Sequence, residues 1–240
     1  MKFDPPFQQA RLVKRYKRFL ADIALDDGRE LTIHCPNTGS MLNCSTPGSR
    51  IWFSTSSSKT RKYPHTFELI EVEGGALAGI NTGRANSLVR EALASGLVSA
   101  LCGYGQVRSE VRYGQENSRI DFLLSDHNEY PGQACYVEVK NVTLGLGDGL
   151  GQFPDAVSTR GSKHLRELMM IAEQGDRAVL FFCVQHSGIE QVSPATGIDP
   201  VYSETLVQAA QAGVEIMAWQ AKMGPAEIRL AREIPVVLPR

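Results

Sequence analysis

The chain has 240 residues, 42% of them apolar and 21% charged, which is an ordinary composition for a folded protein and leaves room for one large domain or two small ones. Its formal net charge is −1, so the global charge by itself indicates neither a polyanionic nor a polycationic partner. The start MKFDPPFQQA lacks the apolar segment of a signal peptide, and no apolar run approaches the length of a membrane span, so we expect a cytoplasmic protein without a membrane partner.

The charges are unevenly distributed along the chain. Residues 1–67 contain 11 Lys/Arg against 5 Asp/Glu, a net of +6, whereas the remaining residues contain 14 against 21, a net of −7. This asymmetry favours an anionic ligand that docks on the first third of the chain.

Residues 1–80 indicate short strands separated by Gly, Pro and Asn turns. LDDGRELTIHC predicts a turn and a strand, and SRIWFSTS and TFELIEVEG predict two more. ARLVKRYKRFLADIAL mixes basic and apolar residues and is compatible with a strand or a helix. Several short strands of this kind are typical of a small β-barrel, so we predict an OB-like, nucleic-acid-binding domain over residues 1–80.

Basic and aromatic residues alternate in RLVKRYKRF. Such a pattern suits a groove that follows a nucleic-acid backbone and stacks its bases, although a charged strand edge that resists aggregation gives the same pattern. The nucleic-acid-binding candidates here are Arg11, Lys14, Arg15, Lys17 and Arg18. The nearby HCPNTGSM (residues 34–41) indicates only a tight turn or a contact between domains.

Residues 81–240 predict an α/β domain with a mixed sheet. NTGRANSLVREALASG predicts a helix that Asn81 or Thr82 caps and Gly96 ends. The strands SEVRYG, RIDFLLSD and CYVEVKNVTL follow, then a helix over residues 159–174, the buried strand RAVLFFCVQ, a helix over residues 203–212 and the strand VEIMAW.

Charged residues interrupt two of these apolar strands. Glu138 and Lys140 share one face of CYVEVKNVTL because strand side chains alternate, and Asp121 lies inside RIDFLLSD. If the two strands pair as a hairpin, Asp121 and Glu138 converge at one edge of the sheet, where a divalent cation relieves their repulsion. Mg²⁺ or Mn²⁺ there would activate a water, and Lys140 would orient that water or offset charge on phosphorus.

This arrangement is that of the PD-(D/E)xK nucleases, and it predicts Asp121, Glu138 and Lys140 as catalytic residues. The preceding helix contributes Glu91 as a third metal ligand beside Asp121 and Glu138. The alternatives are an ion pair on a solvated strand face, an Asp121 that caps a turn or pairs with Arg119, and an ordinary exposed helix glutamate. The literal Pro154-Asp155 follows the Glu-x-Lys triplet in a loop and is not the nuclease aspartate.

A second cluster of candidates lies in FPDAVSTRGSKHLREL. Arg160, Lys163 and His164 crowd a helix start, where free N–H groups and the helix dipole attract anions, so a phosphate site is one interpretation and a solvated helix start is the other. His164 is also a candidate general acid or base.

Seven motifs run in order through most of the chain: RFLADI, HCPNTGSM, NTGRAN, SRIDFLL, YVEVKNVTL, FPDAVSTRGSKHL and REL. In these motifs the chain resembles the bacterial sugar fermentation stimulation protein A family. The resemblance implies an OB-like domain, a PD-(D/E)xK nuclease-like domain with Asp121, Glu138 and Lys140 at its site, non-specific DNA binding and a regulatory role in sugar (maltose) use. It also implies a helix-turn-helix over residues 201–220, but the alternation of Val214, Ile216 and Ala218 predicts a helix followed by a strand.

Two functions remain open at this point. One is a Mg²⁺- or Mn²⁺-dependent nuclease that acts on DNA, with single-stranded DNA as one option, and the other is a regulator that grips DNA without cutting it. The sequence sets neither the natural substrate nor the oligomeric state.

Overall fold

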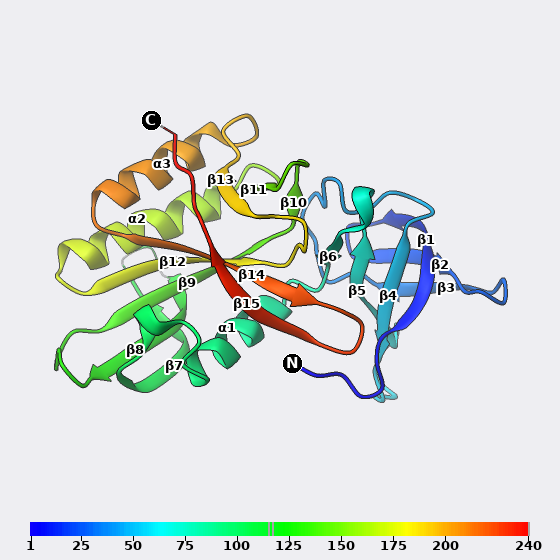
Figure 1. Ribbon diagram of the computed structural model, residues 1–240, viewed down its shortest axis with the longest axis horizontal. Helices are drawn as coiled ribbons and strands as arrows, with labels where there is room; N and C mark the ends of the chain where they lie inside the picture. The colour runs from blue at the N-terminus through cyan, green and yellow to red at the C-terminus, as the bar shows by residue number, and fades with distance from the viewer. Residues whose placement is uncertain (115, 117, 240) are drawn as a thin grey trace.

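The computed structural model describes residues 1–114, 116 and 118–239, and in it an N-terminal barrel packs against a larger α/β domain (Figure 1). Five strands form the barrel: β1 (Gln8–Tyr16), β2 (Leu20–Ala24), β3 (Glu30–His34), β4 (Arg50–Thr55) and β5 (His65–Glu71). β1 pairs with β2 and β4, and β5 pairs with β4 and closes on β3, while β6 (Leu77–Gly79) extends the sheet beyond β5. The closed five-stranded barrel confirms the OB-like prediction.

The segment that was compatible with a strand or a helix is a β-hairpin. β1 and β2 pair antiparallel, and Lys17 and Arg18 form the turn between them with φ of 50° and 65°. Ala10 and Leu12 point into the barrel, whereas Arg11 and Lys14 are exposed. The mixture of basic and apolar residues is therefore the alternation of a strand with one face in the core.

A six-stranded mixed sheet forms the centre of the second domain, in the order β15-β14-β12-β9-β8-β7. β9, β12 and β14 are parallel, and β8, β7 and β15 are antiparallel to their neighbours. The predicted mixed sheet is confirmed, while the strand order and β15 were not predicted. The bounds are β7 (Tyr104–Tyr113), β8 (Ser118–His127), β9 (Cys135–Val142), β12 (Arg177–Val184), β14 (Glu215–Met223) and β15 (Ile228–Ile234).

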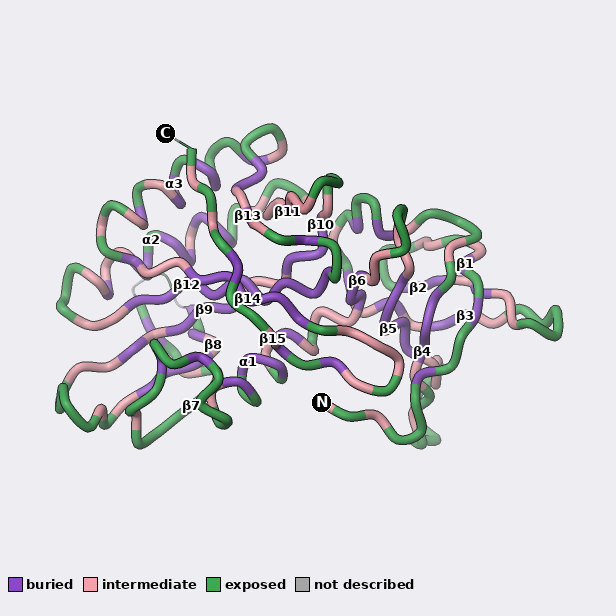
Figure 2. Tube along the Cα trace, in the orientation of Figure 1, coloured by how far each residue is buried: buried purple, intermediate pink, exposed green. Residues whose placement is uncertain are grey.

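Helices cover both faces of this sheet (Figure 1). α1 (Arg84–Ala94) packs on one face through Leu88 and Val89, and α2 (Thr159–Glu173) and α3 (Pro200–Gln211) pack on the other through Leu165 and Leu206. Seven of the eight residues of β12 are therefore buried, as expected for a parallel strand covered on both sides, and Figure 2 shows the buried positions concentrated along the central strands.

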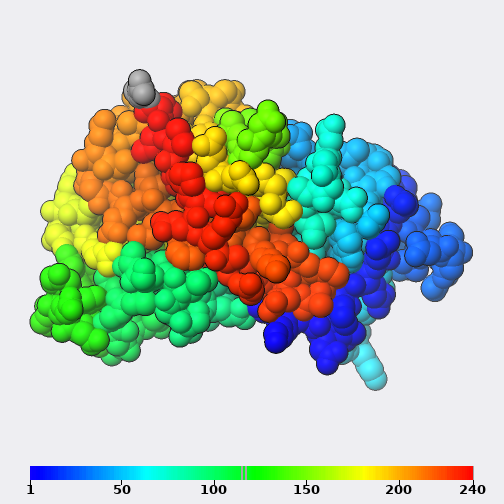
Figure 3. Space-filling view, in the orientation of Figure 1, coloured from blue at the N-terminus to red at the C-terminus, as the bar shows by residue number. Residues whose placement is uncertain are grey.

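Short elements complete the described chain. β10 (Leu144–Gly145), β11 (Leu150–Phe153) and β13 (Gln191–Pro194) form a three-stranded sheet at the junction of the two domains, and two 3₁₀ turns span Glu73–Gly75 and Ser99–Leu101. The N-terminal residues lie along the β14–β15 hairpin, where Phe7 N donates to Pro225 O and Ile228 N donates to Met1 O (Figure 3). No described helix combines the length and the apolar character needed to cross a membrane.

Two helix predictions need correction. α1 begins at Arg84 with no side-chain cap: Asn81 Nδ2 donates to Glu68 Oε2, and Thr82 Oγ1 donates to Pro36 O. The helix-turn-helix that the resemblance implies over residues 201–220 is not formed, since α3 is followed by β14, which pairs with β12 and β15. Ala218 of β14 is buried, and Ile216 packs partly buried against the same core.

Asp199 links the starts of α2 and α3. Its carboxylate is buried and accepts hydrogen bonds from Tyr202 N in α3 and from Ser158 N at the cap of α2. We predict that Asp199→Ala lowers the free energy of unfolding by about 1–3 kcal/mol, because both N–H groups lose a buried partner. Urea denaturation measures this loss, and Glu204→Ala on the exposed side of α3 serves as the matched control with a change below about 0.5 kcal/mol. Equal stability of the two variants would contradict the assignment.

Candidate active site

Asp121 and Glu138 lie where the β8–β9 ladder ends. The last paired residues at this end are Phe122 and Val137, so Asp121 and Glu138 are the next residues of the two strands. Beyond this pair a side chain replaces the backbone partner: Val139 N donates to Asp121 Oδ2 at 2.7 Å. The site therefore lies inside the sheet, between β7 and β12, and not at a sheet edge as we expected from the sequence.

Glu138 is the most deeply buried of the candidates, with 3% of its surface exposed. Its Oε1 accepts from Lys140 Nζ at 2.6 Å and from His164 Nδ1 on α2. Lys140 and Glu138 thus meet on one face of β9, as the strand alternation predicts, and α2 covers them. The other oxygen, Oε2, is buried and has no hydrogen-bond partner among the described residues.

The pKa values of the two carboxyl groups are shifted in opposite directions. Burial and the neighbouring Glu138 carboxylate raise the pKa of Asp121 above its ordinary value, against the hydrogen bonds from Val139 N and Asn86. Burial alone would raise the pKa of Glu138 too, but the hydrogen bond from His164 and the charge of Lys140 outweigh burial and lower it. Glu138 is therefore stabilised as a carboxylate beside Lys140, and the negative charge of Glu138 disfavours ionisation of Asp121.

The donor set suits a hard divalent cation. Carboxylate oxygens are the ligands that such ions prefer, and a buried carboxylate oxygen without a partner costs free energy that a cation would offset. Asp121 and Glu138 are the residues that would hold it. No group of three or more His, Cys, Asp or Glu side chains in the described part of the chain has the arrangement of a metal cluster, so the fit rests on two carboxylates.

The structure does not bring Glu91 to this site. Its exposed carboxylate accepts from the Met1 ammonium at 2.7 Å, on the side of α1 that faces β15. The α1 residue that reaches the site is Asn86, whose Nδ2 donates to Asp121 Oδ1 at 2.7 Å. Asn86 and Glu91 are five residues apart on α1 and project in different directions, so the helix periodicity excludes Glu91 from the Asp121 contact.

The three candidates on α2, Arg160, Lys163 and His164, have different partners and different exposure. His164 is buried and bonds Glu138, while Arg160 is exposed and its Nε donates to His164 Nε2 at 3.3 Å. Lys163 Nζ donates instead to Glu116 O, next to the β7–β8 turn. A line of contacts therefore runs from solvent through Arg160 and His164 to Glu138.

The β1 candidates have two different environments. Arg15 points toward the domain junction, where Nη2 donates to Asn37 O at 3.0 Å and Gly39 O at 2.8 Å, so its guanidinium is part of the framework. The other four candidates on β1 and its turn are exposed: Arg11, Lys14, Lys17 and Arg18. Of these, Lys14 pairs with Asp22 at 3.5 Å.

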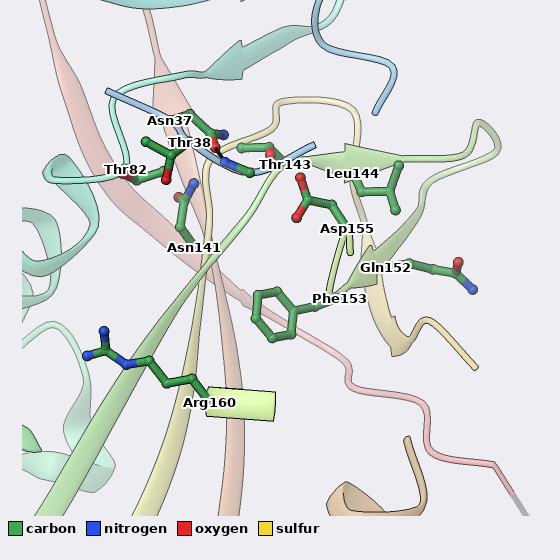
Figure 4. Close-up of a pocket in the computed structure, with 11 residues that line it drawn as sticks. Asn37, Thr38, Thr82, Asn141, Thr143, Leu144, Gln152, Phe153, Asp155 and Arg160 are labelled. Atoms are coloured by element: carbon green, nitrogen blue, oxygen red, sulfur yellow. Dashed lines mark hydrogen bonds between the residues drawn. The ribbon is translucent and has the colours of Figure 1, made fainter. Parts of the chain in front are cut away.

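A cavity of about 460 Å³ lies between the two domains (Figure 4). The loop after β3 contributes Asn37 and Thr38, the end of β9 and the residues after it contribute Asn141 and Thr143, and α2 contributes Arg160. The other lining residues are Gly39, Thr82, Leu144, Gln152, Phe153 and Asp155. Because Arg160 also bonds His164, the cavity adjoins the Glu138 site.

The sequence left the role of residues 34–41 as a tight turn or a domain contact, and in the structure Asn37, Thr38 and Gly39 of this segment line the cavity. Ser40 Oγ donates to Asp155 Oδ2 at 2.9 Å, and Met41 N donates to the same oxygen at 3.0 Å. Further along the loop, Asn43 Nδ2 donates to Gly145 O at 3.0 Å. The segment is therefore a domain contact, and Asp155 is the residue that holds it.

Comparison with known proteins agrees with this arrangement over both domains. Residues 13–80 match the family model described as the SfsA N-terminal OB domain, and residues 83–227 match the model described as the sugar fermentation stimulation protein RE domain. The chain belongs to the sugar fermentation stimulation protein family.

Curated members of this family align over almost the full length. The homologues from Shewanella loihica and Teredinibacter turnerae are each 57% identical over 238 residues, which covers 99% of this chain and 100% of each relative. A solved structure of Pyrococcus furiosus SfsA in complex with Ca²⁺ is similar with a TM-score of 0.87 and 26% identity, covering 99% of this chain and 98% of that one.

Sequence reasoning missed two residues that shape the site. Asn86 contacts Asp121, and its signal was its place on the first turn of the predicted helix, ahead of the more conspicuous Glu91. Glu167 is completely buried, and its Oε1 accepts from Glu116 N at 2.9 Å, which fixes the β7–β8 turn against α2. Its signal was its spacing three residues after His164, on the same helix face.

Asp155 holds residues 40 and 41 against the second domain. We predict that Asp155→Ala lowers the free energy of unfolding by about 1–2 kcal/mol, because Met41 N loses its acceptor and Ser40 Oγ keeps only the backbone oxygen of residue 155. Urea denaturation followed by tryptophan fluorescence measures the change. Asp26→Ala removes an exposed carboxylate in the β2–β3 turn and is the matched control. An unchanged midpoint in Asp155→Ala would show that this anchor contributes nothing to the junction.

Proposed function

We propose that this protein binds DNA largely without sequence specificity and cleaves it with a divalent-metal-dependent phosphodiesterase site at Asp121, Glu138 and Lys140. The observation that carries the proposal is the state of Glu138, which is buried beside Asp121, holds Lys140 and keeps one oxygen without a partner among the described residues. A protein that only grips DNA has no need of buried carboxylates beside a phosphate.

Mg²⁺ or Mn²⁺ is the metal we propose, held by Asp121 and Glu138. The solved Pyrococcus furiosus SfsA is in complex with Ca²⁺, which supports a divalent ion in the family. A bound ion of this kind supplies an activated water and neutralises charge on the phosphate.

The remaining chemistry comes from the side chains around Glu138. Lys140 keeps its ammonium at the site through Glu138 Oε1, where it orients the attacking water or offsets charge on phosphorus. His164 bonds the same oxygen and fixes the rotamer of Glu138. Arg160 is exposed and donates a hydrogen bond to His164, so its guanidinium can contact a phosphate of bound DNA.

The exposed basic residues of the barrel supply the grip on the backbone. Arg15 ties the Lys17–Arg18 turn to the cavity wall, because its Nη2 donates to Arg18 O as well as to Gly39 O. A strand that crosses this turn therefore reaches the cavity and then Arg160. Such phosphate contacts give affinity without reading sequence.

Loss of either carboxylate tests the catalytic part of the proposal. We predict that Asp121→Asn and Glu138→Gln each lower the rate of Mn²⁺-dependent DNA cleavage by at least about 100-fold, because each removes a proposed metal ligand. Rates are measured on labelled DNA under single-turnover conditions, and DNA affinity in EDTA is measured in parallel. We expect unchanged or tighter binding, since each substitution removes negative charge near phosphate.

Glu91→Gln is the matched control, because it also neutralises a carboxylate of the second domain but lies away from the site. It retains the cleavage rate in our proposal. Cleavage that persists in Asp121→Asn and Glu138→Gln rules out this site, and DNA binding by the wild type without any cleavage would leave the non-cleaving regulator as the function.

Metal binding has a readout that does not depend on activity. We predict that Mn²⁺ or Ca²⁺ raises the melting temperature of the wild type and raises that of Glu138→Gln much less, because an ion that binds only the native state stabilises it. Differential scanning fluorimetry with and without EDTA measures the two shifts. Equal shifts in both proteins would place the ion elsewhere.

The salt dependence of binding tests the barrel surface. We predict that changing Arg11, Lys14, Lys17 and Arg18 together to Gln reduces the slope of log K against log salt. The reduction is at most about 3.6 units, at roughly 0.7–0.9 per lost phosphate contact. Fluorescence anisotropy over a range of KCl concentrations gives the slope. Lys222→Gln with Arg229→Gln, both exposed on the β14–β15 hairpin, is the control. An unchanged slope in the barrel variant would show that DNA docks elsewhere.

A further inference from the structure

The cavity between the domains has walls from both of them and chemistry unlike the basic surface around it. Its lining is made mostly of neutral amides and hydroxyls, with one aromatic ring, Phe153, and one cation, Arg160. Asp155 is the only carboxylate among the described residues of the lining, and its Oδ2 accepts from Ser40 Oγ and Met41 N. The volume of about 460 Å³ is in the range of small-molecule sites and far exceeds what one phosphate needs.

Two amide groups in the lining have fixed orientations. Asn37 Oδ1 accepts from Gly39 N at 2.8 Å, and Asn141 Oδ1 accepts from Gln185 Nε2 at 2.6 Å. Because each carbonyl oxygen is taken, each NH₂ group is left to donate elsewhere, and Figure 4 shows the nitrogen of Asn141 on the side of Thr38. The cavity therefore offers donors to a ligand that is rich in acceptors.

Phe153 supplies a flat apolar surface in the same cavity. Its ring packs edge-on against Tyr202, with centroids 5.3 Å apart, and tilted against Phe182 at 5.6 Å, so it is held in place from behind. The residue is only partly buried, and it lies among the lining side chains in Figure 4, whereas Gln152 points away from them. A fixed aromatic ring beside fixed donors is the chemistry that receives a planar heterocycle.

We propose that this cavity binds one unstacked nucleotide of a DNA strand, with its base on Phe153, its base acceptors toward Asn37 and Asn141, and its phosphate toward Arg160. The inference rests on the proposed DNA binding. A base inside a duplex cannot enter such a cavity, so the site selects single-stranded DNA or a nucleotide extruded from the stack. Since Arg160 bonds His164, which bonds Glu138, the held nucleotide lies next to the phosphate that is cut.

The test is a thermodynamic cycle between the base and the ring. A set of short oligothymidylates, each with one abasic position, is bound in EDTA to the wild type and to Phe153→Leu, and affinities are measured by anisotropy. At one position, loss of the base weakens binding to the wild type about 10-fold and weakens binding to Phe153→Leu much less. An equal loss in both proteins at every position overturns the proposal.

A second variant guards against an effect on folding, because Phe153 also packs in the interior. Asn141→Asp keeps the acceptor for Gln185 and replaces the donor that faces the cavity, so it weakens oligothymidylate binding while retaining the melting temperature. Asn128→Asp adds the same charge on the exposed loop after β8 and is the matched control. Equal affinities of Asn141→Asp and Asn128→Asp also overturn the proposal.

The outcomes separate this inference from the proposed function. If the wild type binds oligothymidylate and cuts it through Glu138, but base removal costs the same in wild type and Phe153→Leu, the nucleotide site is wrong and the nuclease stands. If the cycle shows coupling but no cleavage occurs with Mn²⁺, the nucleotide site stands and the catalytic proposal falls. If the wild type binds no DNA in any form, both are wrong.

Discussion

A carboxylate buried inside the mixed sheet is the constraint on which the second domain depends. Glu138 is on β9, an inner strand with α2 over it, and a charge in such a place needs compensating partners. Lys140 comes from the same strand face, and His164 comes from the helix above. α2 lies over the sheet and brings His164 to Glu138. The β8–β9 ladder ends beside Glu138, where Asp121 accepts from Val139 N instead.

The cap of α2 connects this constraint to the rest of the fold. Ser158 caps α2, and Asp199 holds Ser158 N while it also caps α3, so the two helices on this face are fixed together. α2 in turn carries His164 to Glu138 and Arg160 to the cavity. The barrel closes the cavity from the other side, because Asp155 binds residues 40 and 41. Arg160 thus connects the cavity between the domains to the buried Glu138 through His164.

The errors of the sequence interpretation have common physical causes. Glu91 was chosen because it is acidic and lies on the right helix, but a helix of 3.6 residues per turn places Asn86, and not Glu91, toward Asp121. Arg15 was grouped with its basic neighbours, yet its side chain satisfies carbonyl groups of residues 37 and 39. Residue type and spacing do not reveal which partner a long side chain finds across the chain.

The sequence by itself determined the local patterns: the alternation of β1 and β9, the buried run of β12, the helix-then-strand order after residue 200, and the meeting of Glu138 with Lys140. These follow from periodicities of two and 3.6 residues, which are properties of neighbouring residues. Only the tertiary structure decided that residues 34–41 contact Asp155, that His164 covers Glu138, and that a cavity opens between the domains. Those contacts join residues 26 to 115 positions apart, and no local pattern encodes which distant groups meet.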